Sequence, residues 1–169
     1  MIIIKSDSDI RLMRKAGSIT AGALAAAGKA IKVGMSTYEL DKVVEDYIRS
    51  HGAIPSFKGY GGFPASACIS VNEKVIHGIP SKKVILQEGD IVKIDTGATY
   101  HGYVGDSART IPVGTVSEQA QKLIRATRDS FWAGCGLYEY VQIFVISNGT
   151  RTKYYSNTTR ASAIKDSEK

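Results

Sequence analysis

The sequence predicts an α+β domain in which helices cover an antiparallel sheet. Two amphipathic helical patterns occupy residues 6–52, and a β-branched stretch then reverses on itself between residues 90 and 112. A third helical pattern follows that hairpin. Helices and strands that come in separate blocks, rather than alternating one by one, are typical of this fold class.

Composition and charge are those of an ordinary folded protein. The chain has 169 residues, 43% of them hydrophobic and 22% charged, which is enough for one domain with a core. The net charge of +6 permits binding to RNA or ribosomes, although the lysines are scattered rather than clustered. Cys68 and Cys135 form neither a disulfide framework nor a CxxC motif. The opening apolar residues are too few for a signal peptide and no run reaches the length of a membrane span, so we expect a cytoplasmic protein.

Two helices are predicted near the N-terminus. The first is capped by Ser6, with Asp9 in its first turn, and the second opens with a capping box of Ser36 and Glu39 and stops at Gly52. The predicted inner face of the first helix consists of Ile10, Met13, Gly17, Thr20, Ala21, Leu24 and Ala27. That of the second consists of Leu40, Val43, Val44, Tyr47 and Ile48. We interpret both helices as structural cover for the sheet.

A loop rich in glycine and aromatic residues follows at residues 55–64, called the aromatic loop below. It lacks the G-K-[ST] and G-x-G-x-x-G patterns of phosphate-binding loops. Two interpretations stay open: a surface loop, or the wall of an apolar pocket, because aromatic side chains often line ligand sites. Short strands are predicted at residues 68–71 and 75–76. His77 stands at the end of the second, where a histidine is often structural.

The hairpin that turns at residues 100–102 carries two acidic residues, Asp95 and Asp106, placed symmetrically about the turn. A tight antiparallel pairing would set them opposite each other, with Cβ atoms about 5 Å apart. Such a pair would suit two divalent cations about 3.5–4 Å apart, and would cost free energy without a neutralising partner. The alternative is ordinary solvated edge or turn chemistry. A bulge at one of the nearby glycines would also turn one carboxylate to the other face.

A third helix is predicted from Ser117 to near Gly134, with an inner face of Ala120, Leu123, Ile124, Thr127 and Phe131. The remaining residues differ in character. Residues 141–146 are a strong strand signal, and residues 147–169 are polar without periodicity. We therefore expect an N-terminal domain at residues 1–134 and a divergent tail at residues 135–169, formed by one strand and a mobile segment.

Three segments precede the hairpin in a fixed order: the aromatic loop, the stretch C-I-S-V-N-E-K-V-I (residues 68–76) and the motif H-G-I-P (residues 77–80). In this order they resemble the type I methionine aminopeptidases. The resemblance covers roughly residues 4–134 and implies the first half of the duplicated pita-bread fold. It implies metal-dependent removal of the N-terminal methionine from nascent proteins and peptides. It also implies that Asp95 and Asp106 are metal ligands and that His77 hydrogen-bonds the substrate peptide in catalysis. The residues that would enclose the methionine thioether are Phe57, Tyr60, Phe63 and Cys68.

The resemblance stops before the second half of the fold, which in this family brings one ligand histidine, two ligand glutamates and a further substrate-binding histidine. No histidine follows His101. The two ions of the intact family (Co, Mn, Fe or Zn) would therefore meet an incomplete site here. We hypothesise a methionine aminopeptidase truncated near Gly134, with a tail read out of frame or spliced from elsewhere. An open sheet edge would then be covered by the tail, by a partner or by another copy.

Three functions remain open at this stage. The first is an aminopeptidase that acts on chains beginning with methionine, close to the ribosome. The second is a non-catalytic binding module of the same fold for ribosomes, RNA or proteins. The third is a proline-specific or creatine-type hydrolase. The H-G-I-P motif beside the aromatic loop favours specificity for methionine over this third function.

Overall fold

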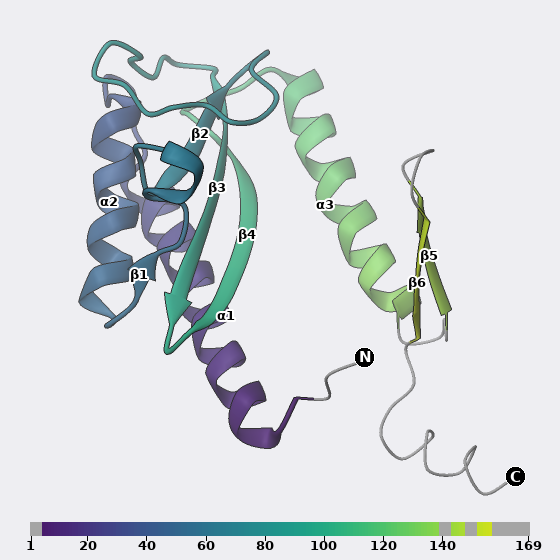
Figure 1. Cartoon of the computed structure of the whole chain (residues 1–169). Coiled ribbons are helices and arrows are strands. Elements are labelled where there is room, and N and C mark those ends of the chain that lie inside the picture. The colour runs from purple at the N-terminus through teal and green to yellow at the C-terminus, as the bar shows by residue number, and fades with distance from the viewer. Residues whose placement is uncertain (1–4, 139–142, 148–151, 157–169) are drawn as a thin grey trace, which may run out of the picture. The chain divides into compact units, whose positions relative to one another are not determined.

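The computed structural model describes residues 5–138, 143–147 and 152–156, and the chain divides into two compact units, Met1–Ala120 and Gln121–Lys169. The elements up to the hairpin are α1 (Asp7–Ala30), α2 (Thr37–Ser50), β1 (Ile54–Pro55), a 3-10 turn η1 (Tyr60–Gly62), β2 (Ala67–Val71), β3 (Ile91–Tyr100) and β4 (Tyr103–Pro112). They are followed by α3 (Glu118–Tyr138), β5 (Ile143–Ser147) and β6 (Thr152–Ser156) (Figure 1). The described helices include none long and apolar enough to cross a membrane.

The sheet of the first unit is antiparallel and is built around β3. Strand β4 pairs with β3 along its whole length, from Ile91 opposite Pro112 to Tyr100 opposite Tyr103. Because a strand has two edges, β1 and β2 share the other edge of β3, β2 beside its first half and β1 near its end. The predicted α+β class and antiparallel hairpin are confirmed.

Both predicted helix starts are confirmed by complete capping boxes. In α1, the Asp9 N–H donates to Ser6 Oγ at 3.3 Å, and Ser6 N–H donates back to the Asp9 carboxylate at 2.8 Å. In α2, Glu39 N–H donates to Ser36 Oγ at 3.2 Å and Ser36 N–H donates to the Glu39 carboxylate at 2.8 Å. Each box satisfies backbone donors that the first helical turn leaves without partners.

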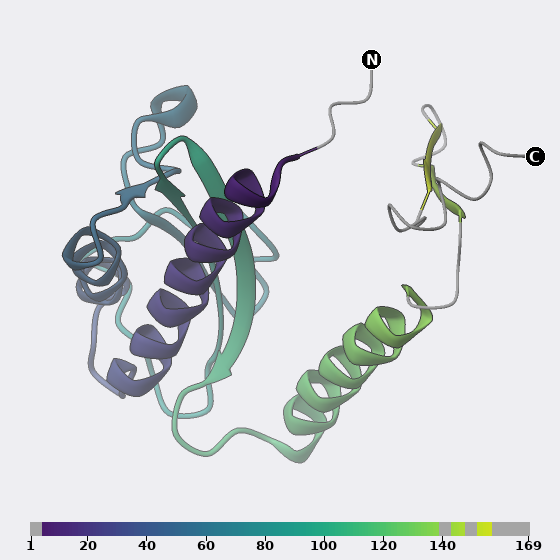
Figure 2. The same ribbon diagram turned by 90° about the horizontal axis from the view of Figure 1, so that it is seen from below.

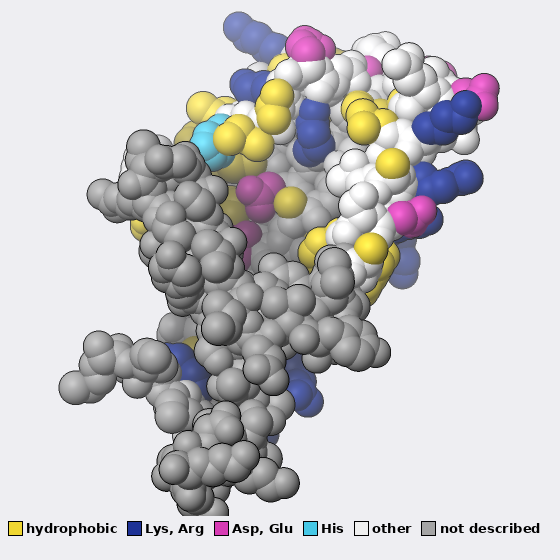
Figure 3. Space-filling view, turned by 90° about the vertical axis from the view of Figure 1, so that its right-hand side faces the viewer, with side chains coloured by type: hydrophobic (Ala, Val, Ile, Leu, Met, Phe, Trp, Pro, Cys, Tyr) yellow, Lys and Arg dark blue, Asp and Glu magenta, His cyan; other side chains and the backbone are white. Residues whose placement is uncertain are grey.

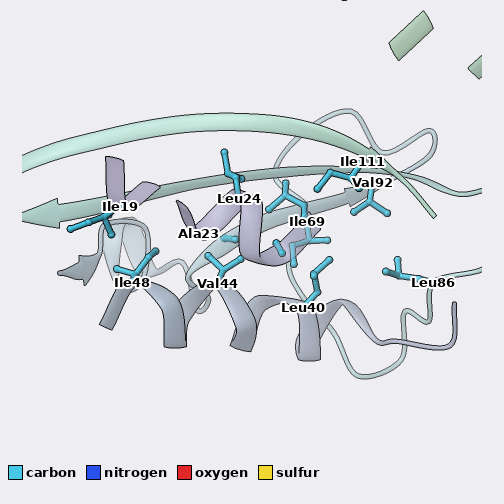
Figure 4. Close-up of a cluster of buried hydrophobic side chains, with 14 of the residues drawn as sticks. Ile19, Ala23, Leu24, Leu40, Val44, Ile48, Ile69, Leu86, Val92 and Ile111 are labelled. Atoms are coloured by element: carbon cyan, nitrogen blue, oxygen red, sulfur yellow. The ribbon is translucent and has the colours of Figure 1, made fainter. Parts of the chain in front are cut away.

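One hydrophobic core joins α1 and α2 to a single face of the sheet (Figure 4). On that face of β3, Val92, Ile94, Thr96 and Ala98 are fully buried. The helices and neighbouring segments contribute Ile19, Ala23, Leu24, Leu40, Val44, Ile48, Ile69, Leu86 and Ile111. Because successive strand residues point to opposite faces, the odd-numbered residues of β3 lie on the face that these two helices leave uncovered.

The buried face of α1 agrees with the predicted one only in part, since Thr20, Leu24 and Ala27 are buried as predicted. Ile10 and Met13 are 44% and 42% exposed, whereas Ala16, Ile19 and Ala23 are buried. The reason is a close approach between α1 and β4, seen edge-on in Figure 2, which selects small residues rather than the largest apolar ones. The pattern of apolar residues therefore predicted the buried face over the second half of the helix but not over the first.

The closest point of that approach is Gly105 in β4. A Cβ atom built there would lie 2.6 Å from the Ala16 carbonyl carbon and 2.6 Å from Gly17 N, both backbone atoms. The Gly105 carbonyl also accepts a hydrogen bond from Thr20 Oγ1 at 2.9 Å. We expect Gly105→Ala to lower the free energy of unfolding by about 2–3 kcal/mol, because α1 must move away from the sheet.

Urea unfolding measures this effect. The matched control is Ser107→Ala, which removes an exposed side chain two residues along the same strand and should change stability by less than about 0.5 kcal/mol. Equal midpoints for Gly105→Ala and the unmodified chain would contradict the close packing of α1 on β4.

α2 buries a charged residue, Glu45, whose side chain is only 7% exposed. Its carboxylate accepts hydrogen bonds from Lys42 at 2.7 Å, Arg49 at 3.0 Å and Lys58 at 2.8 and 2.9 Å. Burial alone would raise the pKa of Glu45, but the three cationic donors outweigh it and lower the pKa from 4.5 to about 2. The ionised form is thus favoured in the folded state.

This network predicts a defined acid sensitivity. Because the folded pKa of Glu45 lies below its unfolded value, its stabilisation is present above about pH 4.5 and is lost as the pH falls toward 2. We expect the unmodified chain to exceed Glu45→Gln in unfolding free energy by about 1–3 kcal/mol at neutral pH, and the difference to shrink below pH 4.5. Urea titrations of both proteins across this pH range measure it, and a constant difference would contradict the ion network.

The remaining predicted elements agree only in part. No strand forms at residues 75–76, because Val75 and Ile76 are exposed and lie in a loop. Ser117 Oγ caps α3 as predicted, by accepting from Ala120 N–H at 3.2 Å, but α3 runs to Tyr138 and not to Gly134. An isolated glycine weakens a helix by about 1 kcal/mol without ending it.

Of the predicted inner face of α3, Leu123 and Phe131 are 59% and 63% exposed, and Ala120 and Ile124 are partly buried. In the tail, β5 lies within the stretch predicted as a strand, and β6 is a second strand, at residues 152–156, within the stretch predicted to be mobile. Residues 139–142, 148–151 and 157–169, also included in the tail prediction, lie outside the described residues.

Candidate metal centre

Asp95 and Asp106 lie on the same face of the sheet, but not opposite each other. In the β3–β4 register Asp95 pairs with Ala108, and Asp106 pairs with Gly97. The predicted direct pairing is therefore wrong by two residues. The two aspartates are diagonal neighbours, for which backbone separations are about 7–8 Å and Cβ separations somewhat less. Carboxylates at this spacing can still reach two ions about 3.5–4 Å apart.

The register follows from the hairpin turn. Tyr100 pairs with Tyr103, so the turn itself contains only His101 and Gly102. Both have positive φ, 47° and 83°, as a two-residue turn of the I′ type requires. The pairing is continuous from end to end, so none of the glycines in the two strands forms a bulge. The carboxylates consequently stay on the face that α1 and α2 do not cover.

The two carboxylates have no neutralising partner among the described residues. Burial and the neighbouring Asp106 raise the pKa of Asp95, whereas the nearby His77 lowers it. Figure 3 shows acidic side chains surrounded by hydrophobic ones on the side of the molecule that it presents. Within the described part of the chain, no group of three or more metal-binding side chains gathers. The described site therefore offers two adjacent oxygen ligands and no more.

Cys68 lies beside these carboxylates. It pairs with Asp95 across β2 and β3, so both side chains project from the same face, and it is only 7% exposed. Burial raises the pKa of the Cys68 thiol, and Asp95 and Asp106 raise it further. The thiol is therefore held in its neutral form, as a small apolar surface next to the acidic pair.

Gly78 fixes the loop that carries His77. Ile69 N–H donates to the Gly78 carbonyl at 2.7 Å, and Gly78 N–H donates to Ser70 Oγ at 3.0 Å. The loop thus lies against the outer edge of β2. His77 itself is exposed and has a positive φ of 57°, which a non-glycine residue adopts only when its surroundings impose it. His77 is near enough to the carboxylate pair to lower the pKa of Asp95, although no hydrogen bond or ion pair joins the two side chains among the described contacts.

The aromatic loop reaches the same face through Phe57. A Cβ atom on Gly97 would lie 3.1 Å from Phe57 Cε1, so the ring occupies the space that a side chain on Gly97 would fill. Phe57 is partly buried there, next to the strand position that pairs with Asp106. Phe63 is also partly buried. Tyr60, in contrast, is 82% exposed, so this structure does not bring it to the carboxylates.

Sequence reasoning missed the role of Gly97. Its presence inside a strand was interpreted as a bulge risk, whereas it provides room for Phe57. A glycine in the middle of a strand also marks close approach of another group, so the signal was present in the sequence. Two buried acidic residues of α2, Asp41 and Glu45, were missed as well, because both helices were interpreted as cover alone.

Comparison with known proteins identifies the family of this chain. The family profile of the metallopeptidase family M24 matches residues 11–139. A methionine aminopeptidase of Clostridium acetobutylicum is 56% identical over 134 residues, which are 79% of this chain and 54% of the relative. The chain thus spans about half the length of the curated relatives it matches.

Solved structures give the same result. The crystal structure of a methionine aminopeptidase from Thermotoga maritima superimposes with a TM-score of 0.73 at 43% identity, covering 76% of this chain and 52% of that one. A prolidase from Pyrococcus furiosus shares the fold at a TM-score of 0.61 and 31% identity, covering 71% of this chain and 34% of that one. Since the family profile covers well over half of the sequence, this chain belongs to the metallopeptidase family M24.

Proposed function

We propose that this chain supplies one half of the active site of a methionine aminopeptidase, which removes the first residue of peptides and proteins that begin with methionine. The observation that carries the proposal is the pair of carboxylates on the uncovered face of the sheet, with Cys68 beside them. The similarity to methionine aminopeptidases supports the choice of substrate.

The acidic pair has the chemistry of a divalent metal site. Asp95 and Asp106 would hold the ions through carboxylate oxygens, and the repulsion that raises the pKa of Asp95 would be relieved by them. Such oxygen ligands accept Co, Mn, Fe or Zn, among which cells select by availability. When bound, two such ions polarise a carbonyl group and lower the pKa of water. The described residues provide only part of the ligand set, so the proposal assigns further ligands elsewhere.

The chain's own residues orient the substrate. Phe57 and Cys68 offer apolar surface beside the acidic pair, which suits a thioether side chain. Phe63 and Tyr60 would extend this surface when a ligand draws the aromatic loop inward. His77, held near Asp95 by its loop, would hydrogen-bond the peptide beyond the first residue. Peptides that begin with methionine arise during synthesis, so the proposal places the protein in the cytoplasm near ribosomes.

Metal titration and peptide hydrolysis test the proposal. We expect the metal-stripped chain to bind Co²⁺ weakly, with a dissociation constant of about 0.1–1 mM, because two carboxylates are a small ligand set. Asp106→Ala should abolish this binding, whereas Asp46→Ala, which removes an exposed carboxylate of α2, should not change it. Equal binding by the unmodified chain and by Asp106→Ala would refute the metal site.

Hydrolysis separates the candidate activities. The unmodified chain with Co²⁺ is offered Met-Gly-Met-Met and an Xaa-Pro dipeptide. Preference for the first peptide supports a methionine aminopeptidase, and preference for the second supports a proline-specific hydrolase. Metal binding without any turnover would support a non-catalytic module, or a half-site that needs a second polypeptide or a second copy of the chain to act.

A further inference from the structure

One face of α2 carries two buried carboxylates that the metal site does not use. Asp41 and Glu45 are 3% and 5% exposed, and they stand four residues apart, one above the other on the helix. Burying two acidic side chains on the same face is unfavourable unless each has specific partners. Their partners lie at the two ends of the aromatic loop.

The start of the loop is fixed on β3 by Ser56, whose N–H donates to the Gly97 carbonyl at 2.9 Å, and Glu45 holds the loop two residues further on, at Lys58. Lys58 Nζ donates to both oxygens of the Glu45 carboxylate, at 2.8 and 2.9 Å. Lys58 directly follows Phe57, whose ring covers Gly97. Lys42 and Arg49 bond the same carboxylate from within α2, so Glu45 keeps counter-charges even when Lys58 leaves.

Asp41 holds the downstream end. Its Oδ1 accepts hydrogen bonds from the backbone N–H groups of Ser66 at 2.9 Å and Ala67 at 2.8 Å. Thr96 Oγ1 donates to the Ser66 carbonyl at 2.9 Å, which ties the same point to β3. Cys68 follows immediately and faces Asp95. The end of the loop and the start of the thiol-bearing strand are therefore fixed together.

Between these two points the loop has little to hold it. Gly59, Gly61 and Gly62 all have positive φ, and their backbone bonds join residues of the loop to one another. Among the described side-chain hydrogen bonds and ion pairs, only Lys58–Glu45 joins residues 57–64 to the rest of the chain. The side chain of Lys58 is 36% exposed and that of Glu45 only 7%, so dissolved ions reach the lysine of this ion pair but not the glutamate.

We propose that Asp41 and Glu45 are positioning residues, which clamp the two ends of the aromatic loop so that its rings line the site for an apolar side chain. In this arrangement the Lys58–Glu45 ion pair is the contact that can break, whereas the hydrogen bonds from the backbone to Asp41 stay formed. Loosening Lys58 loosens the loop after Ser56, and with it the Phe57 ring against Gly97, while Ser56, β2 and Cys68 stay in place. The assignment of the ligand as methionine rests on the proposed function, whereas the clamp itself does not.

Amide hydrogen exchange of the whole chain tests the clamp without any ligand. We expect Lys58→Gln to speed exchange in residues 58–64 by about tenfold, with no change in β3. Glu45→Gln should speed exchange in the loop by more than in β3, because it also lowers the global stability. Lys58→Arg should restore slow exchange, because a guanidinium also reaches the carboxylate. High salt should speed exchange in the unmodified chain and not in Lys58→Gln. The matched control is Asp46→Asn, an exposed carboxylate of α2, which should leave the loop unchanged.

Two results would overturn the clamp: unchanged loop exchange in both glutamine variants, or an increase spread equally over β3, which would mean general destabilisation. Titration with L-methionine amide, followed by NMR, then tests the site. We expect Lys58→Gln to weaken this binding by about fivefold and Lys58→Arg to restore it. If the unmodified chain binds no methionine amide, the proposed function fails while the exchange result still decides the clamp.

Discussion

Gly78→Ala is expected to detach the loop of His77 from the sheet and to lower the free energy of unfolding by about 2–4 kcal/mol. A Cβ atom on Gly78 would lie 2.0 Å from the Ile69 carbonyl oxygen and 2.8 Å from Ser70 Cα. Both are backbone atoms of β2 and cannot rotate away. The loop must therefore lift, which breaks the hydrogen bonds that join Gly78 to Ile69 and Ser70.

Two measurements check this effect. Urea unfolding reports the loss of stability, and NMR of the imidazole rings reports the displacement of His77. The chain has only three histidines, so the rings of His51 and His101 serve as internal references that should not shift. A change confined to stability, with the His77 ring unmoved, would show that the loop does not depend on this contact.

Gly17→Ala is the matched control, because it adds the same methyl group where there is room. No atom lies within 4 Å of a Cβ built at Gly17, which sits in the middle of α1. An alanine inside a helix is more stable than a glycine by about 0.5–1 kcal/mol. The two substitutions should therefore change stability in opposite directions.

Features determined by neighbouring residues could be predicted from the sequence. Ser6 and Ser36 start their helices because each finds an acidic partner three residues on, and the pairing needs no information from the rest of the fold. The turn at His101 and Gly102 is local in the same way. The two helix starts were predicted at the correct residues, and the turn was predicted one residue too long, at residues 100–102.

Features determined by packing could not be predicted so well. The buried side of α1 depends on the approach of Gly105, which is distant in sequence, and an apolar stripe cannot reveal it. The register of Asp95 and Asp106 depends on whether the turn has two residues or more, and a difference of one residue in the turn changes every pair. The two carboxylates still lie on one face of the sheet, because the predicted and observed registers differ by two residues and an even difference leaves the faces unchanged.

The acidic pair was predicted from residue type and order, and Cys68 from the resemblance to the aminopeptidases. The structure places the three residues on one face of the sheet, and their binding of a metal stays a prediction. The partners that position the surrounding loops, Glu45 and Gly78, have no signal in composition or spacing. A buried glutamate in an amphipathic helix resembles an exposed one until its partners, here including Lys58, are located.

Asp95→Asn is expected to stabilise the metal-free chain and, at the same time, to abolish its response to metal. At neutral pH the Asp95 carboxylate is partly buried and faces Asp106 without a cation among the described residues. An asparagine of the same shape removes the repulsion, so we expect a gain of about 0.5–1 kcal/mol in the free energy of unfolding. A residue that supported the fold would show a loss instead.

The pH dependence follows from the raised pKa of Asp95. Protonation of this carboxyl is easier in the folded than in the unfolded state, so the unmodified chain recovers stability as the pH falls through that raised value. The advantage of Asp95→Asn should therefore be largest at neutral pH and should shrink in acid. Asp46→Asn, in which the carboxyl group is exposed, should show neither effect.

Thermal unfolding with and without Co²⁺ completes the test, because an ion that binds only the folded state raises the melting temperature. The melting temperature of the unmodified chain should rise with added Co²⁺, and that of Asp95→Asn should not. In the absence of metal, the variant should have the higher melting temperature. A variant less stable than the unmodified chain in the absence of metal would mean that Asp95 has a structural partner. A variant that still responds to Co²⁺ would move the metal site elsewhere. The predicted combination, higher stability with loss of metal binding, distinguishes a carboxylate retained for a ligand from one retained for the fold.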